Sequence, residues 1–206
     1  PNTPEDTKKA QNGSNIYLTL DSNIQLIAEK AVSTMKDNFN VDWAVFTVMD
    51  AKSGAIVASS TSPNFNPNDT NTITSYMNPL VSYQYEPGSV MKIFSFASAI
   101  EEGVYKGDET FASGSYTLND GTVIRDAERS GWGTINFDTG FAYSSNVAAT
   151  ILGLRLGVDK LTNYYNKLGF GSKTGIELAN EVKGEINFVY ESELSNASFG
   201  QGISVT

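Results

Sequence analysis

Ser89 and Lys92 are the two residues of this 206-residue chain whose types and spacing best suit nucleophilic chemistry. The chain contains no histidine and no cysteine, which excludes Ser-His-Asp and Cys-His catalysis and nearly all zinc and haem sites. The general base of an enzyme with this composition must therefore be Lys, Asp, Glu or Tyr. On a helix, the spacing Ser-x-x-Lys places both side chains on one face, where a neutral lysine can take the serine proton.

The surroundings of Ser89 favour this catalytic interpretation. Ser89 follows the helix-breaking pair Pro87-Gly88 and opens the segment 89–102, the most apolar helical segment of the chain. A lysine in the first turn of such a helix is costly unless it has polar partners, and burial favours its neutral form. The alternative is that Ser89 caps the helix while Lys92 extends outward to solvent.

A second Ser-x-x-Lys segment, Ser33 to Lys36, lies inside a helix predicted over residues 22–38. At about 100° per residue, Ser33 lies on the face opposite Ile24, the first residue of an apolar stripe. We therefore expect Ser33 to be a solvated surface serine without a catalytic role.

Three further segments carry patterns found in serine active sites. Ser144 and Asn146 form a Ser-x-Asn segment that begins 55 positions after Ser89, at the start of a helical stretch. Taken alone, this pair is also typical of an ordinary helix cap. Residues 62–64 (Ser-Pro-Asn) precede Ser89 in a loop rich in Pro and Asn, and we expect no catalytic role for them. Residues 173–175 (Lys-Thr-Gly) lie in a glycine-rich segment that is typical of a surface loop.

The elements that must position these residues are both helical and β-rich. We predict, in chain order, a helix over 22–38 capped by Asp21, a hairpin of strands 43–49 and 55–60, a loop over 61–79, a helix over 89–102, short strands within 110–135, helices over 137–156 and 160–168, and a final forty residues of loop and weak strand. Ile27 and Met35 belong to the apolar stripe of the first helix, which we expect to lie on a core. The helix over 89–102 is apolar on nearly every side, which predicts that it is buried on all sides.

The composition is that of an acidic globular protein. Apolar residues make up 40% and charged residues 18% of the chain, and 14 Lys and Arg against 23 Asp and Glu give a net charge of −9. This charge excludes a nucleic-acid backbone as a partner and disfavours an anionic lipid surface. No apolar stretch approaches the roughly 18 residues of a membrane-spanning helix. The polar residues 1–14 indicate a linker or the end of an upstream domain.

Residues 85–92 (Tyr-Glu-Pro-Gly-Ser-Val-Met-Lys) resemble the active-site segment of penicillin-binding protein transpeptidases. That family carries the motifs Ser-x-x-Lys, Ser-x-Asn and Lys-Thr-Gly, and residues 144–146 follow in the expected order. The third motif of the family comes after a Gly-Gln-Gly segment, seen here at residues 200–202. The resemblance therefore implies that the true third motif lies beyond Thr206, and that Lys173 is a surface loop residue.

Further segments extend the resemblance to residues 14–206. Residues 124–126 (Ile-Arg-Asp), 140–146 and 197–206 are each similar to segments of the monofunctional, class B transpeptidases of the division type. Ala127 departs from the pattern, because division-type relatives often carry an aromatic residue directly after Arg-Asp.

The resemblance implies an α+β fold of the serine β-lactamase and transpeptidase type, with an antiparallel sheet and helices on its faces. Residues 15–206 would form the N-terminal portion of the penicillin-binding transpeptidase domain, with the C-terminal part missing from this chain. We expect such a fragment to be poorly active by itself and to pair with its missing half or with a second copy.

The resemblance also implies catalytic roles for Ser89, Lys92, Ser144 and Asn146. Ser89 would attack the carbonyl between two terminal D-alanines of a peptidoglycan stem peptide while Lys92 takes its proton. Ser144 would relay a proton to the leaving amine, and Asn146 would hold a substrate amide. A second stem peptide would then receive the acyl group, and β-lactams would acylate the same serine. No metal or organic cofactor is implied.

The implied partners are peptidoglycan stem peptides and β-lactams, with no nucleic acid. The whole protein would be anchored by an upstream segment at the extracytoplasmic face of the bacterial membrane, where it would work with the division machinery. Two alternatives stay open: a serine β-lactamase that hydrolyses its acyl-enzyme, and a β-lactam-sensing or non-catalytic scaffold domain. An adduct that turns over in seconds would indicate the β-lactamase, and a long-lived adduct the transpeptidase.

Overall fold

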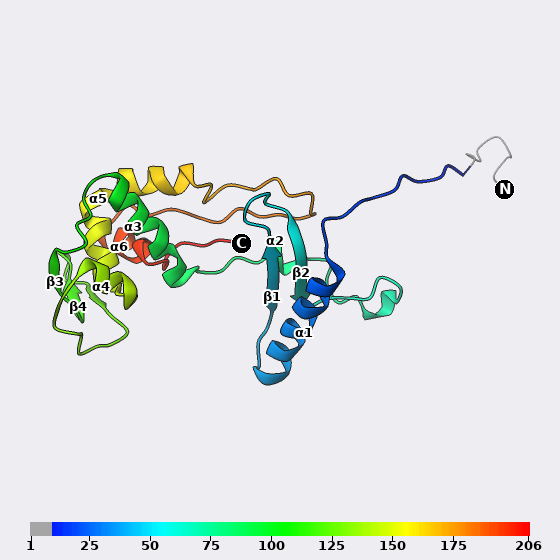
Figure 1. Ribbon diagram of the computed structural model, residues 1–206, viewed down its shortest axis with the longest axis horizontal. Coiled ribbons are helices and arrows are strands. Elements are labelled where there is room, and N and C mark those ends of the chain that lie inside the picture. The colour runs from blue at the N-terminus through cyan, green and yellow to red at the C-terminus, as the bar shows by residue number, and fades with distance from the viewer. Residues whose placement is uncertain (1–9) are drawn as a thin grey trace. The chain divides into compact units, whose positions relative to one another are not determined.

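The computed structural model describes residues 10–206, so residues 1–9 of the expected linker lie outside the described part. Residues 10–20 form neither helix nor strand. The chain divides into two compact units, one that ends at Ser75 and one that begins at Tyr76, and each combines helices with short strands (Figure 1). Within residues 10–206, no helix has the length and apolar character that crossing a membrane requires.

The first unit contains one long helix and one hairpin, as predicted. Helix α1 (Ser22–Asn38) begins at the N-cap Asp21, whose carboxylate accepts two first-turn backbone N–H groups at 2.9 and 3.0 Å. Strands β1 (Ala44–Met49) and β2 (Ile56–Ser62) pair antiparallel, with an irregularity at the end of β1. A short 3₁₀ turn, η2 (Thr70–Thr72), lies in the loop after β2.

The face that α1 packs against β2 overlaps only in part with the predicted apolar stripe. Ala28, which belongs to that stripe, is 0% exposed and Val32 beside it is 6% exposed, whereas Ile27, another member of the stripe, is 63% exposed. The orientation has a polar cause, because the Gln25 side-chain amide donates to the Ser59 carbonyl and accepts from the Ser59 N–H, at 2.9 Å each. These two bonds direct the Gln25 side of the helix toward the strand, so the small residues beside it are buried.

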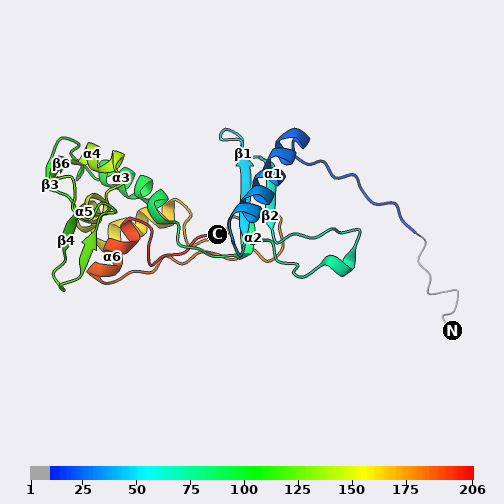
Figure 2. The same ribbon diagram turned by 90° about the horizontal axis from the view of Figure 1, so that it is seen from below.

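The second unit is built around helix α5, which packs against both α3 and α6 (Figure 2). Its elements are α2 (Pro79–Ser82), the 3₁₀ turn η3 (Gly88–Met91), α3 (Lys92–Glu101), β3 (Thr110–Ala112), β4 (Ser115–Thr117), β5 (Val123–Arg125), β6 (Thr134–Asn136), α4 (Phe137–Ala142), α5 (Asn146–Lys167) and α6 (Glu191–Ser198). The pairs β3–β6 and β4–β5 form two small antiparallel sheets, which confirms short strands within residues 110–135. Phe96, Leu152 and Tyr165 are among the buried core residues.

Two predicted helices of this unit have different bounds in the structure. The helix predicted over 137–156 is broken after Ala142, because the Ser145 hydroxyl caps a new helix by accepting a first-turn N–H at 3.0 Å. The helix predicted over 160–168 corresponds to the second segment of α5, because Gly157, with non-helical φ and ψ, separates α5 into two helical segments as the prediction implies. The φ of Gly157 is 77°, a conformation that glycine adopts without steric cost.

Helix α6 contradicts the prediction of loop and weak strand for the last forty residues. Its sequence is polar and rich in serine, so it lacks a recognisable apolar stripe. Serines at 195 and 198 are nevertheless buried, because their hydroxyls donate to helix carbonyls at 2.7 and 2.6 Å. At the N-terminus of the helix, the Glu193 carboxylate accepts the Tyr190 N–H at 3.1 Å.

The apolar segment 89–102 is not buried on all sides, contrary to the prediction. Val90, Ile93 and Ile100 are 61%, 56% and 58% exposed, and their helical spacing places them along one side. Met91 is buried on the opposite side, at 1% exposed. The segment is therefore amphipathic in its packing although its sequence is apolar all round.

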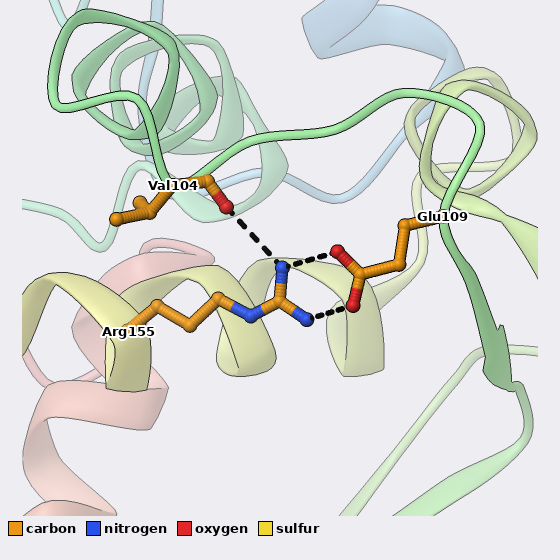
Figure 3. Close-up of polar contacts among 3 residues, drawn as sticks. All are labelled: Val104, Glu109 and Arg155. Atoms are coloured by element: carbon orange, nitrogen blue, oxygen red, sulfur yellow. Dashed lines mark hydrogen bonds and ion pairs between the residues drawn. The ribbon is translucent and has the colours of Figure 1, made fainter.

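Arg155 ties α5 to the connection between α3 and β3 (Figure 3). Its guanidinium makes a two-pronged ion pair with Glu109, at 2.8 and 2.5 Å, and donates to the Val104 carbonyl at 3.2 Å. The same group lies 5.0 Å from the centre of the Phe137 ring. A planar guanidinium can make all of these contacts at once, so one side chain links three segments.

Gly200, just after α6, lies directly against Gly88 in the turn that carries Ser89. The Gly88 N–H donates to the Gly200 carbonyl at 2.9 Å. A Cβ added at Gly200 would lie 2.0 Å from the Gly88 carbonyl oxygen, and the φ of Gly200 is +85°. Both the space and the backbone conformation therefore require glycine at position 200.

We expect Gly200→Ala to destabilise the chain more than Gly202→Ala does. Both glycines have a left-handed φ, which costs an alanine about 1–2 kcal/mol. Only Gly200 adds a clash, worth about 1–3 kcal/mol or more, because the nearest atom to a Cβ at Gly202 is 3.9 Å away. Urea unfolding followed by circular dichroism measures both losses, and equal losses would contradict the close packing of Gly200 on Gly88.

Candidate active site

Ser89 and Lys92 are brought together by the 3₁₀ turn that leads into α3. Gly88 begins this turn with a φ of 59°, and Lys92 is the first residue of the α-helix that follows. The Lys92 Nζ donates to the Ser89 Oγ at 3.2 Å. Ser89 is exposed, whereas Lys92 is 3% exposed. The candidate nucleophile is therefore open to solvent while the candidate base is buried.

Ser144 approaches the same amine from the break between α4 and α5. The Lys92 Nζ donates to the Ser144 Oγ at 3.0 Å and also to the Ser144 carbonyl oxygen. The backbone of the break is held by N–H groups of residues 144 and 145, which donate to the carbonyls of Phe141 and Gly140 at 3.0 and 2.8 Å. Ser89, Lys92 and Ser144, three of the predicted site residues, thus form one hydrogen-bonded group.

Asn146, the fourth predicted site residue, is the first residue of α5 and lies two positions after Ser144. Its side-chain Nδ2 donates to the Arg125 carbonyl at the end of β5, at 2.9 Å. This bond orients the side chain from the β5 side of the site, and the amide oxygen can accept a further hydrogen bond. A role for Asn146 in holding a substrate amide stays a prediction.

The carboxylate of Asp126 is a component of the site to which the sequence analysis assigns no role. Asp126 is 3% exposed, and its Oδ1 accepts the Ser145 hydroxyl at 2.9 Å and the Val147 N–H at 3.0 Å. Its Oδ2 accepts the Gly114 N–H at 2.8 Å. The signal that could have identified it is its place directly after the short strand β5, inside the family-like segment 124–126.

Burial lowers the pKa of Lys92 from its ordinary value of 10.5 to about 8. The main cause is the loss of solvation of the ammonium, which favours the neutral amine. Attraction to Asp126 acts in the opposite direction and raises the pKa. A lysine with this pKa is partly neutral near neutral pH, which is the state that a general base requires.

The literal Lys-Thr-Gly segment is held in a different loop. Lys173 is exposed, and the backbone N–H and hydroxyl of Thr174 both donate to the Glu181 carboxylate at 2.6 Å. These hydrogen bonds lower the pKa of Glu181, and the largest contribution comes from the bond to the Thr174 hydroxyl. The loop is therefore an exposed turn closed on itself by Glu181, as expected for a surface segment.

The family model of the penicillin binding protein transpeptidase domain matches residues 44–206. The chain belongs to this family. Stage V sporulation protein D of Bacillus subtilis is 33% identical over 214 residues, covering 100% of this chain and 33% of that protein. Peptidoglycan D,D-transpeptidase FtsI of Buchnera aphidicola is 24% identical over 200 residues, covering 95% of this chain and 35% of that protein.

A solved structure of penicillin binding protein 3 from Mycobacterium tuberculosis, complexed with aztreonam, superposes with a TM-score of 0.84. It is 31% identical and covers 98% of this chain and 46% of that chain. These findings confirm the predicted family and the α+β class, although the strands of residues 10–206 form small two-stranded antiparallel sheets rather than the single expected sheet. The chain spans about a third of the length of the relatives it matches.

The pKa of Lys92 can be measured directly by competitive acetylation of lysines followed by mass spectrometry. We expect its reactivity to rise with pH around a midpoint of about 8 in the folded chain, because deprotonation creates the reactive amine. The same chain unfolded in urea serves as the control, in which the midpoint returns toward 10.5. Identical midpoints in the two states would contradict the burial of the amine.

Proposed function

We propose that the protein carrying this chain is a peptidoglycan D,D-transpeptidase, and that Ser89, Lys92, Ser144 and Asn146 do its chemistry. The observation that carries the proposal is the Lys92 amine, buried and hydrogen-bonded to both the Ser89 and Ser144 hydroxyls. Family membership supports the reaction class, and one relative is named as a peptidoglycan D,D-transpeptidase.

The proposed reaction is an acyl transfer in two steps. Neutral Lys92 takes the proton of Ser89, whose Oγ attacks the carbonyl between the two terminal D-alanines of a stem peptide. Ser144 passes a proton to the leaving D-alanine amine as the carbon–nitrogen bond breaks, and an acyl ester remains on Ser89. The amine of a second stem peptide then attacks this ester and forms an amide; the bond to Ser89 Oγ breaks, and the proton that the amine loses returns to Ser89 Oγ. The Ser89 backbone N–H is one donor to the oxyanion.

β-Lactams fit the same proposal as acylating inhibitors. Ser89 Oγ attacks the lactam carbonyl, the ring carbon–nitrogen bond opens, and the ring nitrogen takes the proton. The relative of known structure that carries aztreonam supports this assignment. A long-lived adduct is the outcome that separates a transpeptidase from a β-lactamase.

We also propose that residues 15–206 are the N-terminal portion of the transpeptidase domain and that Lys173 is not part of its third motif. The exposed, self-closed loop around Lys173 supports the second statement. The exposed apolar side of α3, with Ile93 and Ile100, supports a further covering element, either the rest of the domain or a second copy. The whole protein would act at the extracytoplasmic face of the membrane, anchored upstream, with the division machinery as a partner.

In the full-length protein, fluorescent penicillin should label Ser89 and leave Ser33 unlabelled. Both serines have a lysine three positions later, but Ser33 is exposed on α1 and its hydroxyl donates to Asp37 at 3.3 Å. Mass mapping of the labelled peptide makes the distinction. A label on the peptide that contains Ser33, or no label at all, would refute the proposed function.

Lys92→Ala in the full-length protein should slow acylation by a factor of about 10² to 10⁴, the usual effect of losing a general base. Lys173→Ala is the matched control, since it removes the same charge from an exposed loop, and we expect acylation close to wild type. Stopped-flow measurement of penicillin labelling gives both rates. A hundredfold loss in Lys173→Ala would make that residue part of the third motif after all.

A further inference from the structure

The buried carboxylate of Asp126 has no place in the catalytic roles proposed above. It is 3% exposed, and neither of the two ion pairs found among residues 10–206 includes it. A buried carboxylate without a paired cation is costly. Where such a group is fully hydrogen-bonded, it rigidifies the structure that surrounds it.

The hydrogen bonds of Asp126 converge on the turn that precedes α5. Its Oδ1 accepts the Ser145 hydroxyl and the Val147 N–H, one residue on either side of Asn146, at 2.9 and 3.0 Å. Its Oδ2 accepts the Gly114 N–H at 2.8 Å, which anchors the carboxylate to the start of β4. The negative charge also lies at the N-terminus of the 22-residue helix α5, where it is favoured by the helix dipole.

Ser144 requires a support of this kind. Its φ of 56° lies in the left-handed region, which serine rarely adopts, and such conformations persist only where the surrounding structure holds them. The conformation matters because it places the Ser144 hydroxyl 3.0 Å from the Lys92 Nζ. The Asn146 side chain, bonded to the Arg125 carbonyl at 2.9 Å, is held from the same end of β5.

We propose that Asp126 is a positioning residue for acyl transfer: its carboxylate holds residues 144–146 so that the Ser144 hydroxyl stays against Lys92. This inference rests on the transpeptidase function proposed above. Asp126 touches no reacting atom, and it acts through the turn and through its charge.

The charge has a separate effect that can be measured. Attraction to Asp126 stabilises the Lys92 ammonium, so removing the charge lowers the pKa of Lys92 further. The neutral groups bonded to the amine are the hydroxyls of Ser89 and Ser144 and the Ser144 carbonyl oxygen. Of the nearby charged side chains, Arg125 is exposed and Glu86 accepts the N–H of Gly202 at 2.9 Å.

Three variants of the full-length protein separate the two effects. Asp126→Asn removes the charge and places the side-chain NH₂ group, a donor, opposite the Gly114 N–H, so that this hydrogen bond is lost. Ser145→Ala removes one hydrogen bond of the turn and keeps the charge. Glu128→Gln is the matched control, because it removes an exposed carboxylate two positions from Asp126.

The rate of Ser89 acylation by fluorescent penicillin is measured across pH for each variant. We expect Asp126→Asn to be slower by about 10- to 100-fold, a typical effect of a misplaced catalytic group, with its rising limb moved to lower pH. Acylation of Ser89 should also be slower in Ser145→Ala, but the midpoint of its pH dependence should stay at the wild-type value. Glu128→Gln should change neither quantity.

Competitive acetylation of Lys92 gives a second readout that does not depend on acyl transfer. We expect the pH midpoint of Lys92 acetylation to fall in Asp126→Asn and to keep its wild-type value in the other two variants. Failure of Ser89 to become labelled in the wild type would refute the proposed function, while this titration still tests the influence of Asp126.

Folded Asp126→Asn with wild-type acylation at every pH would overturn the inference, and so would an unchanged Lys92 midpoint. If Asp126→Asn does not fold, the acylation rate of Ser145→Ala tests the positioning role. A wild-type rate in that variant would overturn it.

Discussion

A lysine amine buried at the start of an apolar helix needs hydrogen-bond partners, and its burial lowers its pKa; both hold for Lys92 in the second unit of this protein. Lys92 is 3% exposed and bonded to two serines, and its pKa falls to about 8. The stability cost of this arrangement is offset by the packing of α3 on α5.

The same packing fixes where the amine lies. The Ser95 hydroxyl in α3 lies 2.8 Å from the Tyr165 hydroxyl in α5 and donates to the Ser198 carbonyl in α6 at 2.6 Å. Burial raises the pKa of Tyr165, so that its hydroxyl stays protonated and able to donate. Gly200 then carries the chain from α6 directly against Gly88. One buried polar junction therefore joins the three helices at the base of the turn that presents Ser89.

The sequence predicts those parts of the structure that depend on local signals. Asp21 identifies the start of α1, and the glycine-ended turn identifies the hairpin, because caps and turns act within a few residues. The sequence does not predict α6, since hydrogen-bonded serines bury it without an apolar stripe. It also misses the role of Gln25, whose bonds to Ser59 decide which face of α1 is buried. Both cases depend on contacts that local periodicity does not encode.

The Ser-x-x-Lys motif alone does not identify the site, because the burial of the lysine determines whether the pair can do chemistry. Ser33 and Lys36 have the spacing of Ser89 and Lys92, yet both lie on an exposed helix face and neither is buried. What distinguishes Ser89 is the burial of its lysine, which the sequence indicates only through the apolar residues around it.

Two consecutive serines separate the buried carboxylate of Asp126 from Lys92, whose proposed role as a base requires the neutral amine. Ser144 is bonded to Lys92, and Ser145 is bonded to Asp126. A direct ion pair between Lys92 and Asp126 would hold the lysine as an ammonium and remove it as a base. With the serines interposed, the carboxylate orders the turn through hydrogen bonds, and its charge opposes only part of the effect of burial on Lys92. The anion can therefore serve as a structural anchor without cancelling the lowered pKa of Lys92, on which the proposed proton transfer from Ser89 depends.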